Sequence, residues 1–172
     1  MFQLRELVLH SHRERVMAHL ARTIGRGHDA IYHGTRHLSP VLRTGVLLPP
    51  SVGDLAVFFT RSPEVAAYWA NMIVEKRDQL CGGILVLNRS SLVHTYRLEP
   101  SRYTVDWDDE REEAVWHRRI NIRRHLLGVV RHRDVDNIIT SRPGALLREG
   151  RAKVREIIVR QRETTFLNAY TP

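Results

Sequence analysis

Cysteine is almost absent from this chain, because Cys81 is the single one among 172 residues. One cysteine excludes an internal disulfide and a zinc cluster built from cysteines, so we expect a reducing compartment, most simply the cytoplasm. Long apolar runs are also missing, since none approaches the roughly 18–20 residues of a membrane span. Charged residues begin within the first six positions, and we therefore expect neither export nor membrane insertion.

The motifs of the commonest nucleotide-binding folds are missing too. No G-x-G-x-x-G follows an expected strand and no G-x-x-x-x-G-K occurs, which argues against a doubly wound dinucleotide fold and a P-loop. The ten histidines suggest metal binding, but His10 and His12, which flank Ser11, would point to opposite sides of a helix. We therefore expect no metal site.

Basic residues outnumber acidic ones, and nearly all of them are arginine. The formal net charge is +8, and Lys76 and Lys153 are the only lysines among 27 basic residues. Such an excess favours an acidic partner such as nucleic acid, because arginine and lysine neutralise phosphates. The arginines are scattered rather than gathered in one block, so a solvated basic surface and the codon use of a GC-rich genome are the alternatives.

The spacing of apolar residues predicts one mixed α+β domain that spans residues 1–172. We expect an N-terminal helix within 1–27, a core at 29–140 with a split mixed or antiparallel sheet flanked by helices, and C-terminal strands within 141–172. Ser62 suits a helix N-cap and Pro63 the first helical position. In detail, helices are expected at 4–24, 40–43, 62–75 and 120–130, strands at 29–34, 56–59, 83–87, 93–97, 113–116, 135–140 and 153–160, a loop at 47–54 and a hairpin turn at 149–151.

His33 lies where an apolar strand meets Gly34. A ring in this position can face a cleft, and a glycine lets a ligand approach the backbone closely. The alternative is a partly buried histidine that is hydrogen-bonded to a local carbonyl. The strand with Phe58 and Phe59 is followed by a helix with Tyr68, which can place two aromatic planes around a flat ring, although core packing explains such aromatics equally well.

The acidic run at 106–113 ends directly before the apolar residues Ala114, Val115 and Trp116. Most of its carboxylates suit a solvated loop. Glu113 differs because the strand that follows can hold it rigidly at the mouth of a cleft. A fixed carboxylate is what a reaction with developing positive charge on a ribose carbon requires.

Together these segments resemble the ADP-ribosyltransferase superfamily, in its histidine–tyrosine–glutamate branch, which includes diphtheria toxin and the poly(ADP-ribose) polymerases. The resemblance covers roughly residues 31–116. It rests on Tyr32-His33-Gly34-Thr35, on Phe58-Phe59-Thr60 followed by Ala66-Ala67-Tyr68, and on the L-x-x-V-L-x-x-G pattern from Leu38 to Gly45. The first aromatic is phenylalanine where that branch usually has tyrosine.

The resemblance implies an ADP-ribosyltransferase-like fold and NAD as the co-substrate. His33 would hydrogen-bond a ribose hydroxyl, the Gly34 backbone would hold the nicotinamide carboxamide, and Thr35 completes this motif. Tyr68 would stack on the nicotinamide ring, with Phe58 or Phe59 on its other side. Glu113 would hold the 2′-hydroxyl of the nicotinamide ribose as the catalytic carboxylate, and Glu112 and Glu110 compete with it for that role.

The resemblance further implies a mono-ADP-ribosyltransferase that modifies a macromolecule, in the manner of a bacterial or phage toxin or effector. The basic composition tilts the acceptor toward DNA or RNA rather than protein, and Tyr103, Trp107 and Asp108 are the residues expected to touch it. Two alternatives stay open. One is an RNA 2′-phosphotransferase, which depends on arginines and a histidine rather than on a glutamate, and the other is an inactive binding module of the same fold.

Overall fold

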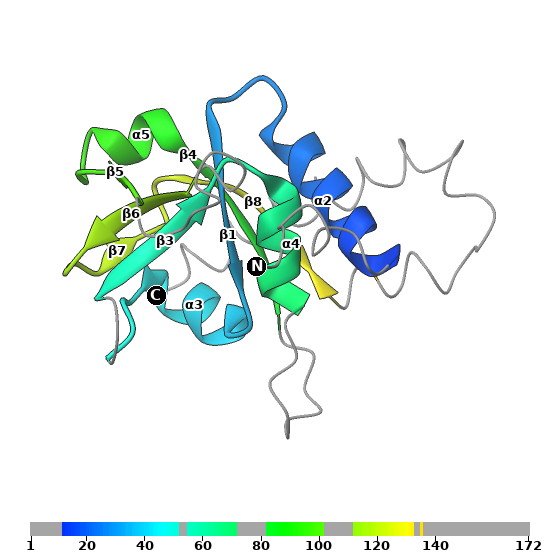
Figure 1. The fold of residues 1–172 in the computed structure, drawn as a ribbon, viewed down its shortest axis with the longest axis horizontal. Coiled ribbons are helices and arrows are strands. Elements are labelled where there is room, and N and C mark those ends of the chain that lie inside the picture. Colours follow the sequence, from blue (N-terminus) through cyan, green and yellow to red (C-terminus); the bar gives the residue numbers. More distant parts are fainter. Residues whose placement is uncertain (1–11, 52–54, 72–81, 102–111, 133–134, 136–172) are drawn as a thin grey trace, which may run out of the picture.

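The computed structural model describes residues 12–51, 55–71, 82–101, 112–132 and 135 (Figure 1). Several predictions lie outside these residues: the expected helix before residue 12, the end of the helix expected at 62–75, the strands beyond residue 135 and the hairpin at 149–151. Within the described residues the protein is an α+β structure with antiparallel strand pairs and flanking helices, which confirms the predicted class. None of the described helices is both long enough and apolar enough to cross a membrane.

The core is a six-stranded antiparallel sheet with β1 (Ala30–Thr35) near its centre. Its strand order is β5-β6-β3-β1-β4-β8, so apart from β5 and β6 no two neighbouring strands follow one another directly in the chain. β1 pairs with β4 along its full length and with β3 through Tyr32, so it is an inner strand of the sheet. The other strands are β3 (Ala56–Thr60), β4 (Gly83–Asn88), β5 (Glu99–Pro100), β6 (Glu112–Trp116) and β8 (Leu126–Arg131).

A separate two-stranded sheet pairs β2 (Val46–Leu47) with β7 (Ile120–Asn121). It follows α3 (Leu38–Thr44), which ends at Gly45 in the left-handed conformation with φ 70°. This is the glycine stop that the sequence predicts, since a glycine adopts positive φ without a Cβ clash. The predicted loop at 47–54 therefore begins one residue later than expected, after a short strand.

The two faces of the large sheet bury different sets of side chains. Tyr32, Ile84 and Val86 pack against α2 (His12–Gly25) and α4 (Pro63–Asn71), which lie together on one side of the sheet in Figure 1. The alternate residues on the other face, among them Ile31, Phe59 and Leu85, pack against side chains of α3, β2, β7 and α5 (Arg89–Val93). Successive side chains point to opposite faces of a strand, so one strand such as β1 supplies both cores.

The start of α4 confirms a local prediction. The Val65 backbone N–H donates a hydrogen bond to Ser62 Oγ over 3.4 Å, so Ser62 caps the helix as expected and Pro63 takes its first position.

Two predicted elements are wrong. Residues 120–130 form β7, a turn and β8 rather than a helix. Buried Ile120 and Ile122 flank exposed Asn121, which is the two-residue period of a strand. The strand expected at 93–97 is instead the end of α5 and a turn, because Asn88 Oδ1 accepts the Ser91 N–H over 3.0 Å and starts a helix there.

Candidate active site

His33, Phe59 and Glu113 lie side by side across three neighbouring strands. Phe59 pairs with Glu113 between β3 and β6. Tyr32 pairs with Thr60 between β1 and β3, so one step along the antiparallel register His33 lies opposite Phe59. The rings of His33 and Phe59 are 5.7 Å apart. Residues that lie opposite one another share a face of the sheet, so the fold brings the predicted histidine and the predicted glutamate to one face.

The ring of His33 is fixed in orientation and tautomer. Its Nδ1–H donates a hydrogen bond to the Phe58 carbonyl over 2.7 Å, since a carbonyl can only accept. Burial lowers the pKa of His33 below its ordinary 6.5, against the opposing effect of this hydrogen bond. Near neutral pH the ring is therefore uncharged, and its Nε2 carries a lone pair that can accept a hydrogen bond.

Strands β1 and β3 part directly after Tyr32. Within the described residues their ladder consists of one pair, Tyr32 with Thr60, whereas β1 pairs with β4 along its full length. The Phe58 carbonyl meets the His33 side chain, so it points toward β1. Backbone groups alternate sides along a strand, so the N–H and C=O of Gly34 point toward β3, where the ladder gives them no opposing residue.

The absent side chain of Gly34 is explained by α4. A Cβ built there would lie 2.0 Å from the Ala66 carbonyl oxygen and 3.0 Å from the Ala70 nitrogen. The close approach that this glycine permits on its side-chain face is therefore that of a helix. The contact of the Gly34 backbone with a ligand, which the resemblance implies, stays a prediction.

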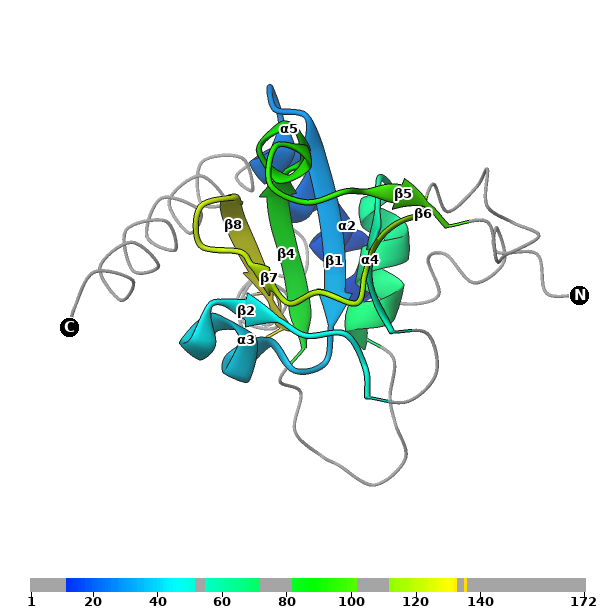
Figure 2. The same cartoon turned by 90° about the vertical axis from the view of Figure 1, so that its left-hand side faces the viewer.

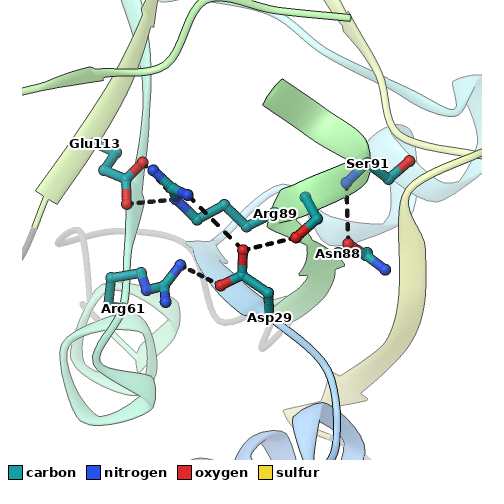
Figure 3. Close-up of polar contacts among 7 residues, drawn as sticks. Asp29, Arg61, Asn88, Arg89, Ser91 and Glu113 are labelled. Carbon is teal, nitrogen blue, oxygen red and sulfur yellow. Dashed lines mark hydrogen bonds and ion pairs between the residues drawn. The ribbon is translucent and has the colours of Figure 1, made fainter. Parts of the chain in front are cut away.

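Glu113 is held by Arg89, a contact that the sequence did not predict (Figure 3). The Nε of Arg89 lies 2.8 Å from each carboxylate oxygen of Glu113. The Glu113 side chain is 13% exposed and that of Arg89 is 32% exposed, so the carboxylate is the more shielded partner. A charge-assisted contact of this kind orients the carboxylate as well as stabilising it.

Arg89 belongs to a wider cluster with Asp29 and Arg61. Asp29 contacts Arg61 over 2.7 Å and Arg89 over 3.8 Å, and it accepts a hydrogen bond from Ser90 Oγ over 2.9 Å. Burial alone would raise the pKa of Asp29, but the Ser90 hydroxyl and the two arginines outweigh it, and the pKa lies below the ordinary 3.8. Two carboxylates and two arginines thus form a charge-balanced network that includes the predicted Glu113.

The remaining predicted residues have different surroundings. Phe59 is 1% exposed and belongs to the core, whereas Phe58 is partly buried and its ring meets Trp116 edge-on at 6.2 Å. Tyr68 is partly buried on α4, with its ring 5.5 Å from that of Trp69. Its stacking on a ligand therefore stays a prediction.

The structure places Thr35 and Glu112 but not the four other predicted residues. Thr35 Oγ1 accepts a hydrogen bond from the His37 N–H over 3.1 Å. Glu112 precedes Glu113 on β6 and so points to the opposite face of the sheet. Glu110, Tyr103, Trp107 and Asp108 lie outside the described residues.

Sequence reasoning missed Asp29, Arg61 and Arg89. A signal for them existed, because Asp29 directly precedes β1, Arg61 follows β3 and Arg89 follows β4. Because β3 and β4 both run antiparallel to β1, the start of β1 and the ends of β3 and β4 lie at the same end of these strands. In the part of the chain that is described, no group of three or more histidine, cysteine, aspartate or glutamate side chains is arranged to hold a metal ion.

Comparison with known proteins gives no further guide. No protein-family model, curated protein or solved structure matches the chain.

Proposed function

We propose that the protein is an NAD-dependent mono-ADP-ribosyltransferase that transfers ADP-ribose to a macromolecule. The observation that carries the proposal is the adjacency of His33, Phe59 and Glu113 on one face of the sheet. Separate sequence motifs predict these three residues. Phe59 lies 26 positions after His33 and 54 positions before Glu113 in the sequence. A chance motif match gives no reason for them to meet.

In the proposed reaction the bond between the ribose C1′ and the nicotinamide nitrogen breaks, and nicotinamide leaves with the bonding electrons. The Glu113 carboxylate, held by Arg89, would accept a hydrogen bond from the ribose 2′-hydroxyl. Its negative charge would stabilise the positive charge that develops on the sugar. The neutral His33 would accept a hydrogen bond from a second ribose hydroxyl through Nε2. An acceptor nucleophile then bonds to C1′ and loses its proton.

The nicotinamide would lie beside Gly34, where the β1–β3 ladder has ended after the Tyr32–Thr60 pair. Gly34 directs a backbone donor and a backbone acceptor toward it, and a carboxamide carries the complementary acceptor and donor. Phe58 is partly buried on β3, and strand alternation points its ring to the face opposite that of Phe59 and Glu113. The Gly34 backbone groups would therefore recognise the amide without any side-chain charge, and a contact of Phe58 with the ring stays a prediction.

Nicotinamide release from NAD tests the proposal directly. Purified protein would be incubated with NAD labelled on the adenine phosphate and with separate DNA, RNA and protein fractions, and both free nicotinamide and label in each fraction would be measured. We expect release by the wild type and loss of roughly 100-fold in His33→Ala, by analogy with removal of one transition-state contact. His37→Ala is the matched control, because His37 is an exposed histidine four residues away. Absence of release in every fraction would leave the inactive binding module.

Arg89 is expected to act as a positioning residue for Glu113. Arg89→Gln should lower kcat about 10-fold or more with little change in KM for NAD, because Arg89 would act through the Glu113 carboxylate. Arg89→Lys keeps the charge but not the planar contact of Nε with both oxygens, so it should recover only part of the rate. The measurement is steady-state NAD cleavage beside thermal melting. A rate loss that lysine restores fully would indicate that charge alone matters.

RNA 2′-phosphotransfer is the second candidate, and one observation favours it. Arg61 and Arg89 continue the alternation of the strand residues that share a face with His33, and that family depends on arginines and a histidine. A 2′-phosphorylated RNA oligonucleotide that loses its phosphate in the presence of NAD, with Glu113 dispensable, would select this function.

A further inference from the structure

Two described segments of the chain contain no acidic residue. Residues 36–51 and 117–132 include neither aspartate nor glutamate, although the described chain has such residues on α2, before β1 and on α4, β5 and β6. The same two segments carry seven arginines, namely Arg36, Arg43, Arg118, Arg119, Arg123, Arg124 and Arg131. These seven arginines therefore lie in segments that hold none of the acidic residues of the described chain.

The two segments form one surface, which we call the basic face. Val46 pairs with Asn121 and Leu47 with Ile120, and the Ile122 N–H donates to the Gly45 carbonyl over 2.9 Å. The guanidinium of Arg123 lies 3.5 Å from the Thr44 carbonyl, which brings it beside the end of α3. Figure 2 shows α3, β2 and β7 lying together in front of the sheet.

The charges of the basic face are presented to solvent. Arg43, Arg118, Arg119, Arg123 and Arg124 are all exposed. Other arginines of the described chain form ion pairs with carboxylates outside the basic face, namely Arg22, Arg61, Arg89 and Arg97. The basic face has no carboxylate of its own within 36–51 or 117–132, so its positive field is not neutralised from within.

We propose that the basic face binds the phosphate backbone of a nucleic acid. An exposed guanidinium group can donate two parallel hydrogen bonds to the oxygens of one phosphate. Its binding also releases counterions that are condensed on the nucleic acid. The face adjoins the candidate active site through β6, since Trp116 follows Glu113 by three residues, about 10 Å along a strand. That the nucleic acid is the acceptor of ADP-ribose rests on the proposed function, whereas its binding does not.

Fluorescence anisotropy without NAD tests the binding separately from the reaction. The probes are labelled 20-nucleotide single-stranded RNA, single-stranded DNA and duplex DNA, titrated at several salt concentrations. We expect Arg118→Gln with Arg119→Gln to weaken binding on the order of 10-fold and to reduce the salt slope by about 1.5 to 2. The three probes distinguish RNA from DNA and single strand from duplex.

The matched control removes the same charge elsewhere. Arg15 and Arg26 are exposed at or near α2, so Arg15→Gln with Arg26→Gln lowers the net charge equally and should change affinity less than 2-fold. A second pair, Arg123→Gln with Arg124→Gln, covers the case in which the first variant does not fold. Equal losses in the basic-face and control variants, or no binding of any probe at 50 mM salt, which is about the low end of the usual range, would overturn the proposal. If binding persists but NAD is not cleaved, the basic face stands and the proposed function fails.

Discussion

Glu113→Gln is expected to abolish most NAD cleavage while Glu112→Gln leaves it nearly unchanged. Glutamine keeps the size of the side chain but removes the negative charge that would stabilise the sugar cation, and loss of one such group costs roughly 100- to 1000-fold in kcat. The two glutamates are adjacent on β6, and strand alternation points them to opposite faces. Both variants remove one negative charge at the same place in the strand. A difference in rate between them therefore reports the face to which the carboxylate points.

The measurement is the initial rate of nicotinamide release at saturating NAD, with melting temperature as a check on folding. Glu113→Gln also removes the charged partner of Arg89, so a modest fall in melting temperature is expected and does not explain a rate loss of this size. A larger loss in Glu112→Gln than in Glu113→Gln would move the catalytic role to the other face. Full activity in both variants, together with removal of a 2′-phosphate from RNA, would select the phosphotransferase.

Gly34→Ala is expected to destabilise the fold by about 3 kcal/mol or more. The new Cβ would lie 2.0 Å from the Ala66 carbonyl oxygen, and neighbouring elements hold both the Gly34 backbone and this carbonyl in place. For a chain of this size such a loss lowers the melting temperature by roughly 6–12 °C. The variant should also lose NAD cleavage, because a shift of β1 away from α4 carries His33 with it.

Gly27→Ala is the control for this change. Gly27 has φ +80° but no atom within 4 Å of an added Cβ, so its replacement measures the backbone cost alone, about 1–2 kcal/mol. Thermal unfolding followed by circular dichroism compares the two variants. A Gly34→Ala protein as stable as Gly27→Ala would mean that α4 does not pack on β1 as closely as described.

Much of the central sheet could be predicted because its strands are apolar and bounded by glycine, proline or charged residues. The strand at Gly83–Asn88 and the cap at Ser62 are such cases. The segment 120–130 misled because Ile122, Leu126 and Val130 fit a helical period as well as two strands. Pairing of β7 with β2 and of β8 with β4 decides between these, and that pairing is a long-range property which local spacing does not contain.

The candidate site divides in the same way. His33 and Glu113 could be chosen from their position at the ends of apolar strands, and their adjacency then follows from the order of the strands. The contact between Arg89 and Glu113 spans 24 positions, and arginine is so common in this chain that no pattern singles out this one. Partner choice among abundant charged residues requires the three-dimensional arrangement.

The single residue pair between β1 and β3 divides the large sheet into two half-sheets, β5-β6-β3 and β1-β4-β8. His33 belongs to one half and Glu113 to the other. Three side-chain contacts tie the halves together across this seam: His33 with the Phe58 carbonyl, Asp29 with Arg61, and Arg89 with Glu113. The distance between the two candidate catalytic groups is therefore set by these polar side chains together with the one Tyr32–Thr60 pair, and the residues that would carry the chemistry also hold the two halves of the sheet in register.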